Sequence, residues 1–441
     1  MRALVFERNL ARFAASKVAA AVAGSGHGVG VGPLELLEID PPDLPSQRWV
    51  RLAPRLSGIC GSDLATLDGR SSRYFERIVS FPFVPGHEIV ADATGGVFDG
   101  ARVVVEPVLG CEARGIDPPC QACAGGHRGA CEHLAFGDLA PGLQTGFCAD
   151  TGGGWGAGLV AHESQLWAVP EGFTDEDAVM VEPTACAVHA ACSAGLESGA
   201  SVVVLGAGTL GLCTIASLRA FTLPGRLLAV AKHPEQRRLA AELGADLVVK
   251  PEETRRAARR LASTLALGPD GGRVERLAGG VDVVFDCVGS ADSLEECLSI
   301  VRPGGEIVLV GMPGVVRLDL APLWQREVRL RGAYAYGTEL RPDGPRRTFE
   351  LAFELVASAG LGRLVSAAYP LERYEEAVAH AAAAGRRGAE KIVFDLRRPA
   401  RRRPGGAQEA PGPGGAKDEH GPGGAKDEHG PTGAPDHKES P

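Results

Sequence analysis

The chain has 441 residues, a length typical of two or three domains, and its 44% hydrophobic content is sufficient for packed cores. Its 46 Lys and Arg against 55 Asp and Glu give a formal charge of −9, which argues against binding to nucleic acid or an anionic membrane. Residues 1–10 lack the pattern of a signal peptide, and no apolar run is long enough to span a bilayer, so we expect a soluble, cytoplasmic protein.

Residues 1–181 contain short runs of Val, Leu and Ile separated by Gly and Pro, a texture that predicts an antiparallel, partly closed β domain. Possible metal ligands lie in and just after it: Cys60 in GICGSD, His87 and Glu88 in VPGHEIV, and Glu182 in VEPTA. One thiolate, one imidazole and one or two carboxylates would leave zinc an open position, as catalysis requires. Taken singly, they could be a buried thiol, a core histidine and a helix-start acid.

A second group of possible ligands is compact. Four cysteines occur within 21 residues of a Gly- and Pro-rich stretch, at Cys111, Cys120, Cys123 and Cys131. Closely spaced cysteines in an intracellular chain more often hold metal than form disulfides. The spacing predicts a closed, structural zinc site, in which the eight-residue gap after Cys111 is the least regular part.

From residue 182 to about 330, strands alternate with helices, which predicts βαβ units and a doubly wound parallel sheet of the Rossmann type. The first of these strands leads into a GxGxxG turn and then a helix. This context predicts that the turn binds the pyrophosphate of a dinucleotide at the helix N-terminus. The residues that we expect to contact the coenzyme there are Gly206, Gly208, Thr209, Leu210 and Gly211.

The choice between NAD and NADP depends on the end of the next strand. An NAD site usually places Asp or Glu there, whereas no acidic residue occurs between Gly206 and Pro234. Lys232 and Arg237 could instead neutralise a 2′-phosphate, so the sequence favours NADP over NAD. The alternative is that both are solvated charges at the start of a helix.

The remainder has two textures. Residues 331–396 mix strands and helices that could pack on either preceding domain. Residues 397–441 contain the tandem repeat GPGGAKDEH and lack aromatic and β-branched aliphatic residues, which predicts a disordered, low-complexity tail. His420, His429 and His437 in this tail could bind metal weakly, although a solvated extension is the simpler interpretation.

Taken together, GICGSD, PGHE, the four cysteines, VEP, GAGTLG, FDCVG and the closing KIVF resemble the zinc-dependent medium-chain alcohol dehydrogenases. The resemblance covers residues 1–396 and is greatest to the sorbitol-, threonine- and glucose-dehydrogenase-like branch. It implies an α/β architecture: a GroES-like catalytic domain, a Rossmann domain, and a C-terminal segment that returns to the catalytic domain. It also implies hydride transfer between an alcohol and NAD(P), and a homodimer or homotetramer.

The resemblance also implies roles for individual residues. Cys60, His87 and Glu182 would hold a catalytic zinc, with Glu88 as an exchangeable ligand or a neighbour of the metal. Asp63 would orient His87, and Ser62 would accept the proton of the alcohol. Many relatives carry a histidine three residues after this hydroxyl, whereas this chain has Ala65, which leaves the final proton acceptor unassigned.

Other features are open. Residues 14–32 look like an enlarged early hairpin without a known role, and the substrate pocket would be lined by Leu64, Phe83, Trp155 and Trp324, of which the aromatic ones could equally be core. A polyol, a sugar, an amino-alcohol and an aromatic alcohol are all compatible with these residues as the substrate. Two alternatives remain: a zinc-independent NADPH reductase on the same fold, and a non-catalytic binding or scaffold protein.

Overall fold

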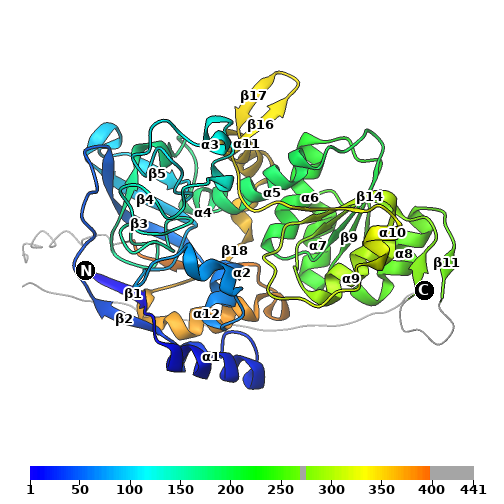
Figure 1. Ribbon diagram of the computed structural model, residues 1–441, viewed down its shortest axis with the longest axis horizontal. Helices are drawn as coiled ribbons and strands as arrows, with labels where there is room; N and C mark the ends of the chain where they lie inside the picture. Colours follow the sequence, from blue (N-terminus) through cyan, green and yellow to red (C-terminus); the bar gives the residue numbers. More distant parts are fainter. Residues whose placement is uncertain (269–274, 398–441) are drawn as a thin grey trace, which may run out of the picture. The chain divides into compact units, whose positions relative to one another are not determined.

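The computed structural model describes residues 1–268 and 275–397 (Figure 1). The predicted low-complexity tail lies outside the described residues from position 398 onward. None of the described helices is long and apolar enough to cross a membrane.

A seven-stranded, mainly antiparallel sheet forms the first domain, with strand order β18-β19-β3-β4-β5-β7 and with β6 paired to β3. Two of its strands, β18 and β19, come from the end of the described chain. β19 joins the sheet by pairing antiparallel with β3, with Val393 opposite Gly58. The members are β3 (Trp49–Gly58), β4 (Ile89–Thr94), β5 (Arg102–Val105), β6 (Leu159–His162), β7 (Leu166–Ala168), β18 (Val365–Tyr369) and β19 (Lys391–Asp395).

The second sheet is six-stranded and parallel, with the order β10-β9-β8-β13-β14-β15. This is the Rossmann order, in which the chain reverses direction across the sheet beside β8 and leaves a crevice at the carboxyl ends of the strands. Its strands are β8 (Ser201–Leu205), β9 (Arg226–Val230), β10 (Leu247–Val249), β13 (Val281–Asp286), β14 (Val301–Leu309) and β15 (Arg329–Gly332). The helices between them are α6 (Thr209–Phe221), α7 (Pro234–Glu242), α8 (Thr254–Leu261), α9 (Ala291–Ile300) and α10 (Ala321–Gln325).

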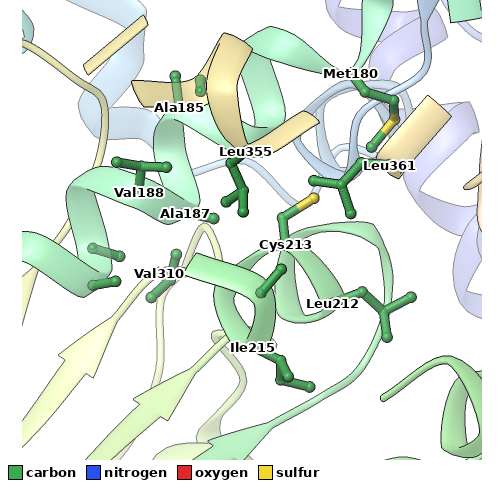
Figure 2. Close-up of a cluster of buried hydrophobic side chains, with 14 of the residues drawn as sticks. Met180, Ala185, Ala187, Val188, Leu212, Cys213, Ile215, Val310, Leu355 and Leu361 are labelled. Atoms are coloured by element: carbon green, nitrogen blue, oxygen red, sulfur yellow. The ribbon is translucent and has the colours of Figure 1, made fainter. Parts of the chain in front are cut away.

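One apolar cluster runs from the first sheet to the second through three helices, α5 (Val181–Ser193), α6 and α11 (Thr348–Ala359). Figure 2 shows Ala185 and Val188 of α5 beside Leu212, Cys213 and Ile215 of α6 and Leu355 of α11. All of these side chains are almost completely buried. Many side chains of α5 are alanine, and their small size allows α6 and α11 to pack closely on it.

The early hairpin differs from the expectation. β1 (Arg2–Phe6) and β2 (Leu34–Glu38) do pair antiparallel, but the chain between them forms helix α1 (Leu10–Ala23) rather than extended strands. Residues 10–23 are rich in Ala and contain neither Gly nor Pro, and Asn9 caps the helix by accepting the N–H of Arg12 at 3.1 Å. The glycines that follow end the helix at Gly24, where φ is +100°.

The smaller elements complete the described chain. The short helices are α2 (Gly61–Leu67), α3 (Gln121–Ala124), α4 (Asp175–Val179) and α12 (Tyr374–Ala382). Two small two-stranded sheets are formed by β11 (Ala266–Leu267) with β12 (Arg276–Leu277), and by β16 (Thr338–Arg341) with β17 (Gly344–Arg347).

Candidate active site

The first turn of α2 places three polar residues of the site. Cys60 is the N-cap, and its N–H donates to Asp63 Oδ2 at 2.8 Å, which anchors this buried carboxylate one turn into the helix. Ser62 lies between them. Because β3 ends at Gly58, the strand delivers this turn to the edge of the first sheet.

His87 lies just before β4 and is only 4% exposed. Its Nδ1 lies 3.5 Å from Asp63 Oδ1, and its Nε2 lies 3.5 Å from Ser62 Oγ. Burial acts to lower the pKa of His87, but the charges of Asp63, Cys60 and Glu182 and a hydrogen bond with Cys60 together outweigh it and hold the pKa well above its usual value. Asp63 therefore fixes the ring so that Nε2 faces Ser62.

Glu88 forms a buried ion pair with Lys391, the first residue of the last strand, β19. The Lys391 ammonium also donates to the carbonyl of Ile59 at 3.3 Å. Gly58 makes room for this pair, because a Cβ at that position would lie 1.7 Å from Glu88 Oε2. Gly58 and Lys391 were not among the residues selected from the sequence, since only the pairing of β19 with β3 brings them to Glu88.

Glu182 faces the same region from α5. Its Oε1 accepts the hydroxyl of Tyr336 at 3.0 Å, and the thiol of Cys186 lies 3.7 Å away. Burial raises the pKa of Glu182 to about 7, although the charge of His87 acts in the opposite direction. Tyr336 was also missed by the sequence reasoning, because it lies more than 150 residues further along the chain.

The possible ligand atoms of Cys60, His87 and Glu88 all lie within 4.8 Å of one another. Glu182 is not part of this close group. A thiol, an imidazole and a carboxylate are the donor types that zinc prefers, and three protein ligands leave an open position. The donor set therefore fits a catalytic zinc, and Glu182 lines the same cavity.

The four predicted lobe cysteines, Cys111, Cys120, Cys123 and Cys131, also lie within 4.8 Å of one another, counted from sulfur to sulfur. Backbone N–H groups point at these sulfurs; that of Cys120 lies 3.3 Å from Cys111 Sγ. Burial acts to raise the pKa of Cys120, but the N–H groups of Glu132 and Cys123 bring it down to about 7. Four sulfurs with N–H donors around them fit a closed zinc site.

The glycine turn lies at the start of α6, with Gly206 at φ +88°. A Cβ at Gly211 would lie 1.8 Å from the carbonyl oxygen of Gly206, so only glycine fits there. Gly208, Thr209, Leu210 and Gly211 line a cavity of about 1790 Å³, which is also lined by Cys60, Ser62, His87, Glu88 and Glu182. One cavity thus joins a turn suited to a dinucleotide and a donor set suited to zinc.

Lys232 and Arg237 meet at the end of β9 without lining this cavity. Arg237 donates to the carbonyls of Lys232 at 2.9 Å and Ala231 at 3.4 Å, so its guanidinium lies over the strand end. The C-terminal segment also reaches this place: a Cβ at Gly385 would lie 2.5 Å from the ring of His233. From this segment Glu390 contacts α7, where Gln236 Nε2 lies 3.5 Å from its carboxylate.

Two of the four expected pocket residues line the cavity, namely Leu64 and Phe83. Neither tryptophan lines it. Trp155 is fully buried, packs edge-on against Phe394 and donates its indole N–H to the carbonyl of Gly58 at 3.2 Å, so it belongs to the core. Trp324 is 80% exposed on α10, away from the cavity.

Comparison with known proteins identifies the family. Residues 46–171 match the alcohol dehydrogenase GroES-like domain, and residues 209–369 match the zinc-binding dehydrogenase domain. Sorbitol dehydrogenase 1 of Saccharomyces cerevisiae is 30% identical over 317 residues, which cover 69% of this chain and 81% of the yeast protein. The chain belongs to the zinc-dependent medium-chain alcohol dehydrogenases.

Another relative in this family is L-idonate 5-dehydrogenase of Vitis vinifera, 27% identical over 397 residues that cover 85% of this chain and 98% of the grape protein. A zinc-binding dehydrogenase from Sinorhizobium meliloti, solved bound to NADP, superposes with a TM-score of 0.61. It is 23% identical, and the match covers 82% of this chain and 95% of that structure. The likeness establishes that this medium-chain dehydrogenase has the fold of its family, and membership makes it a hydride-transferring oxidoreductase.

Proposed function

We propose that this dehydrogenase oxidises a hydroxyl group of a polyol, or reduces the corresponding carbonyl, with NADP as its preferred coenzyme. The observation that carries the proposal is the shared cavity, which is lined both by Cys60, His87 and Glu88 and by residues 208–211 of the glycine turn. The names of the relatives support the substrate class, since those compared act on sorbitol and on L-idonate, both of which are polyhydroxy compounds.

In this proposal Cys60, His87 and Glu88 hold the catalytic zinc, and Glu182 serves as a further or alternative ligand. Bound there, zinc supplies Lewis-acid polarisation of the substrate oxygen and lowers the pKa of its hydroxyl. The buried pair with Lys391 holds Glu88 in place, while the hydrogen bond from Tyr336 holds Glu182.

The chain's own residues position the substrate and take its proton. Ser62 Oγ, 3.5 Å from His87 Nε2 on the cavity wall, accepts a hydrogen bond from the reacting hydroxyl and passes its own proton on as it takes up that of the substrate. Asp63 keeps the imidazole in the required orientation through Nδ1. Ala65 lines the same wall, so the proton continues from Ser62 to coenzyme or water rather than to a histidine at that position.

The coenzyme is held at two places. N–H groups at the start of α6, together with Gly206, Gly208, Thr209, Leu210 and Gly211, receive the pyrophosphate. At the end of β9, Lys232 and Arg237 receive the 2′-phosphate, where an NAD enzyme would place a carboxylate. The main support for NADP is that Arg237 is already positioned over the carbonyls of Ala231 and Lys232.

Further parts of the proposal concern structure rather than chemistry. Cys111, Cys120, Cys123 and Cys131 hold a structural zinc that ties down a long loop. We place the enzyme in the cytoplasm as a homodimer or homotetramer, as is usual for its family. Sedimentation of the purified protein checks the assembly.

The proposal is tested by measuring zinc content together with NAD- and NADP-linked oxidation of a panel of polyols. Wild type is compared with Cys60→Ser. Two zinc ions per chain, falling to one with loss of turnover in the variant, are expected. One zinc ion in both proteins would support the zinc-independent reductase instead. Two zinc ions without hydride transfer to any polyol would support a non-catalytic binding protein.

A further inference from the structure

The insertion between β1 and β2, residues 7–33, has no part in the proposed chemistry. Phe6 and Leu34 are register partners, so residues 7–33 leave and re-enter the hairpin at one point. Figure 1 shows α1, in dark blue, beside α12. Gly26, in the turn after α1, packs on α12, since a Cβ there would lie 2.8 Å from Ala382 Cβ.

This insertion is fixed to the segment that follows α2. Ser16 is fully buried and donates its hydroxyl to the carbonyl of Leu67, the last residue of α2. The N–H of Gly26 donates to the buried carboxylate of Asp68 at 2.9 Å. Gly69 packs against Lys17 and Phe13, with its Cβ position 3.1 Å from Lys17 Cβ. The helix that begins at the site and the insertion therefore form one wall.

The wall carries positive charge into the cavity. Its basic lining residues are Arg8, Lys17, Arg70 and Arg73, whereas its acidic ones are Glu7 and Glu76. Arg70 forms an ion pair with Asp68 Oδ2 at 3.0 Å, which offsets part of its charge, and donates to Ser25 Oγ at 3.2 Å, so a residue of the insertion helps to hold it. Arg73 is neutralised by Glu76 at 2.9 Å. Neither Arg8 nor Lys17 takes part in an ion pair among residues 1–268 and 275–397.

The basic residues and the site residues line the same cavity and are connected by α2. The seven residues of α2 rise about 10 Å from the Cys60 end to Leu67. Arg70 follows directly, with its N–H donating to the carbonyl of Ala65 at 2.8 Å. A six-carbon polyol whose reacting hydroxyl lies at Ser62 would direct its far end toward Arg70 and Lys17.

We infer that the insertion makes the enzyme selective for a polyol that bears an anionic group, a carboxylate or a phosphate, at the end remote from the reacting hydroxyl. Lys17 and Arg70 contact that group, and Arg8 adds to the field at the entrance. The inference rests on the proposed polyol dehydrogenase activity. The positive charge at this wall would offset the net charge of −9, which by itself repels an anionic substrate.

The test compares three substrates with the zinc-loaded, full-length enzyme: sorbitol, sorbitol 6-phosphate and gluconate. We expect kcat/KM for at least one anionic substrate to exceed that for sorbitol by tenfold or more. Lys17→Met should lower kcat/KM for that substrate about tenfold, mainly through KM, and Arg70→Met should do so by a similar factor. Both variants should change sorbitol oxidation less than threefold. Raising the ionic strength should weaken the preference in wild type.

Arg12→Met is the matched control, because Arg12 is on the same helix, pairs with Glu35 and does not line the cavity. The relative rates with phosphate and carboxylate identify which anion is preferred. Three outcomes would overturn the inference: sorbitol as the best substrate, equal losses on charged and neutral substrates, or an increased Kd for the coenzyme with unchanged substrate KM. If wild type oxidises none of the three and no other polyol, the proposed function itself fails.

Discussion

Arg114 is expected to hold the four-cysteine lobe closed, and Arg114→Met should open it. The side chain is fully buried in the eight-residue gap between Cys111 and Cys120. It donates hydrogen bonds only to backbone carbonyls of the same loop, which tie together positions far apart along it. The acceptors are Leu109 at 3.1 Å, Phe136 at 3.0 Å, Leu139 at 3.2 Å, Ala140 at 3.4 Å and Gly142.

The size of the effect follows from these contacts. A buried carbonyl that loses its donor costs about 1–3 kcal/mol, so the three buried acceptors, Leu109, Leu139 and Gly142, lose about 5 kcal/mol near the middle of that range. Removing a buried charge recovers part of that loss, because the guanidinium no longer has to leave water. A net destabilisation of about 3 kcal/mol remains, which corresponds to an opening equilibrium about 150-fold more favourable.

Hydrogen exchange of the amides between residues 109 and 142, together with the rate of zinc release to a chelator, measures this opening. Arg114→Lys keeps the charge but has fewer donors, and should give an intermediate rate. Arg48→Met is the control: Arg48 also contacts the lobe, through Glu112 at 2.9 Å, but it is half exposed and should matter little. Exchange in Arg114→Met within threefold of wild type would refute the reasoning.

Three other predictions concern the site. Gly58→Ala should abolish turnover by displacing Glu88, whose Oε2 would lie 1.7 Å from the new Cβ, whereas Gly268→Ala, with open space around it, should not. The double variant Lys232→Ala, Arg237→Ala should raise KM for NADP about 30-fold and change KM for NAD less than threefold. Arg238→Ala is the control, and equal effects on both coenzymes would contradict the assignment. Burial raises the pKa of Glu390 to about 7, so its folded form prefers the proton, and stability is lost as pH rises from about 4.5 to about 7. Glu390→Gln should therefore stabilise the folded protein by about 2 kcal/mol at pH 8 and not at pH 4, measured as the shift in Tm. An equal shift in Tm at the two pH values would contradict an origin in the ionisation of Glu390.

The local parts of the site could be predicted from the sequence because short motifs specify them. Cys60 and Ser62 are placed by one helix start, and the glycine turn by one strand–turn–helix unit. The partners that stabilise these residues could not be predicted in this way. Lys391 reaches Glu88 only because β19 pairs with β3, and Tyr336 reaches Glu182 from a distant segment. Composition gave no signal for either contact.

Aromatic residues show the same limit. Trp155 and Trp324 looked equivalent in the sequence, but one is fully buried and the other is 80% exposed. The backbone packed around Trp155 distinguishes it from Trp324, since Gly86 lies so close that a Cβ at position 86 would be 2.4 Å from the Trp155 ring. The helix α1 is a different case, since its Ala-rich sequence favours a helix locally and it enlarges the hairpin that β1 and β2 form.

The long-range contacts also explain why the site and the fold depend on each other. Glu88 and Lys391 are both almost completely buried, so either charge alone would be costly by several kcal/mol. The pair forms only when β19 has joined the first sheet beside β3. The same segment carries Glu390 and Gly385 to α7 and the end of β9. Residues 384–395 therefore connect the proposed zinc ligands to the strand end at which we propose that the coenzyme binds.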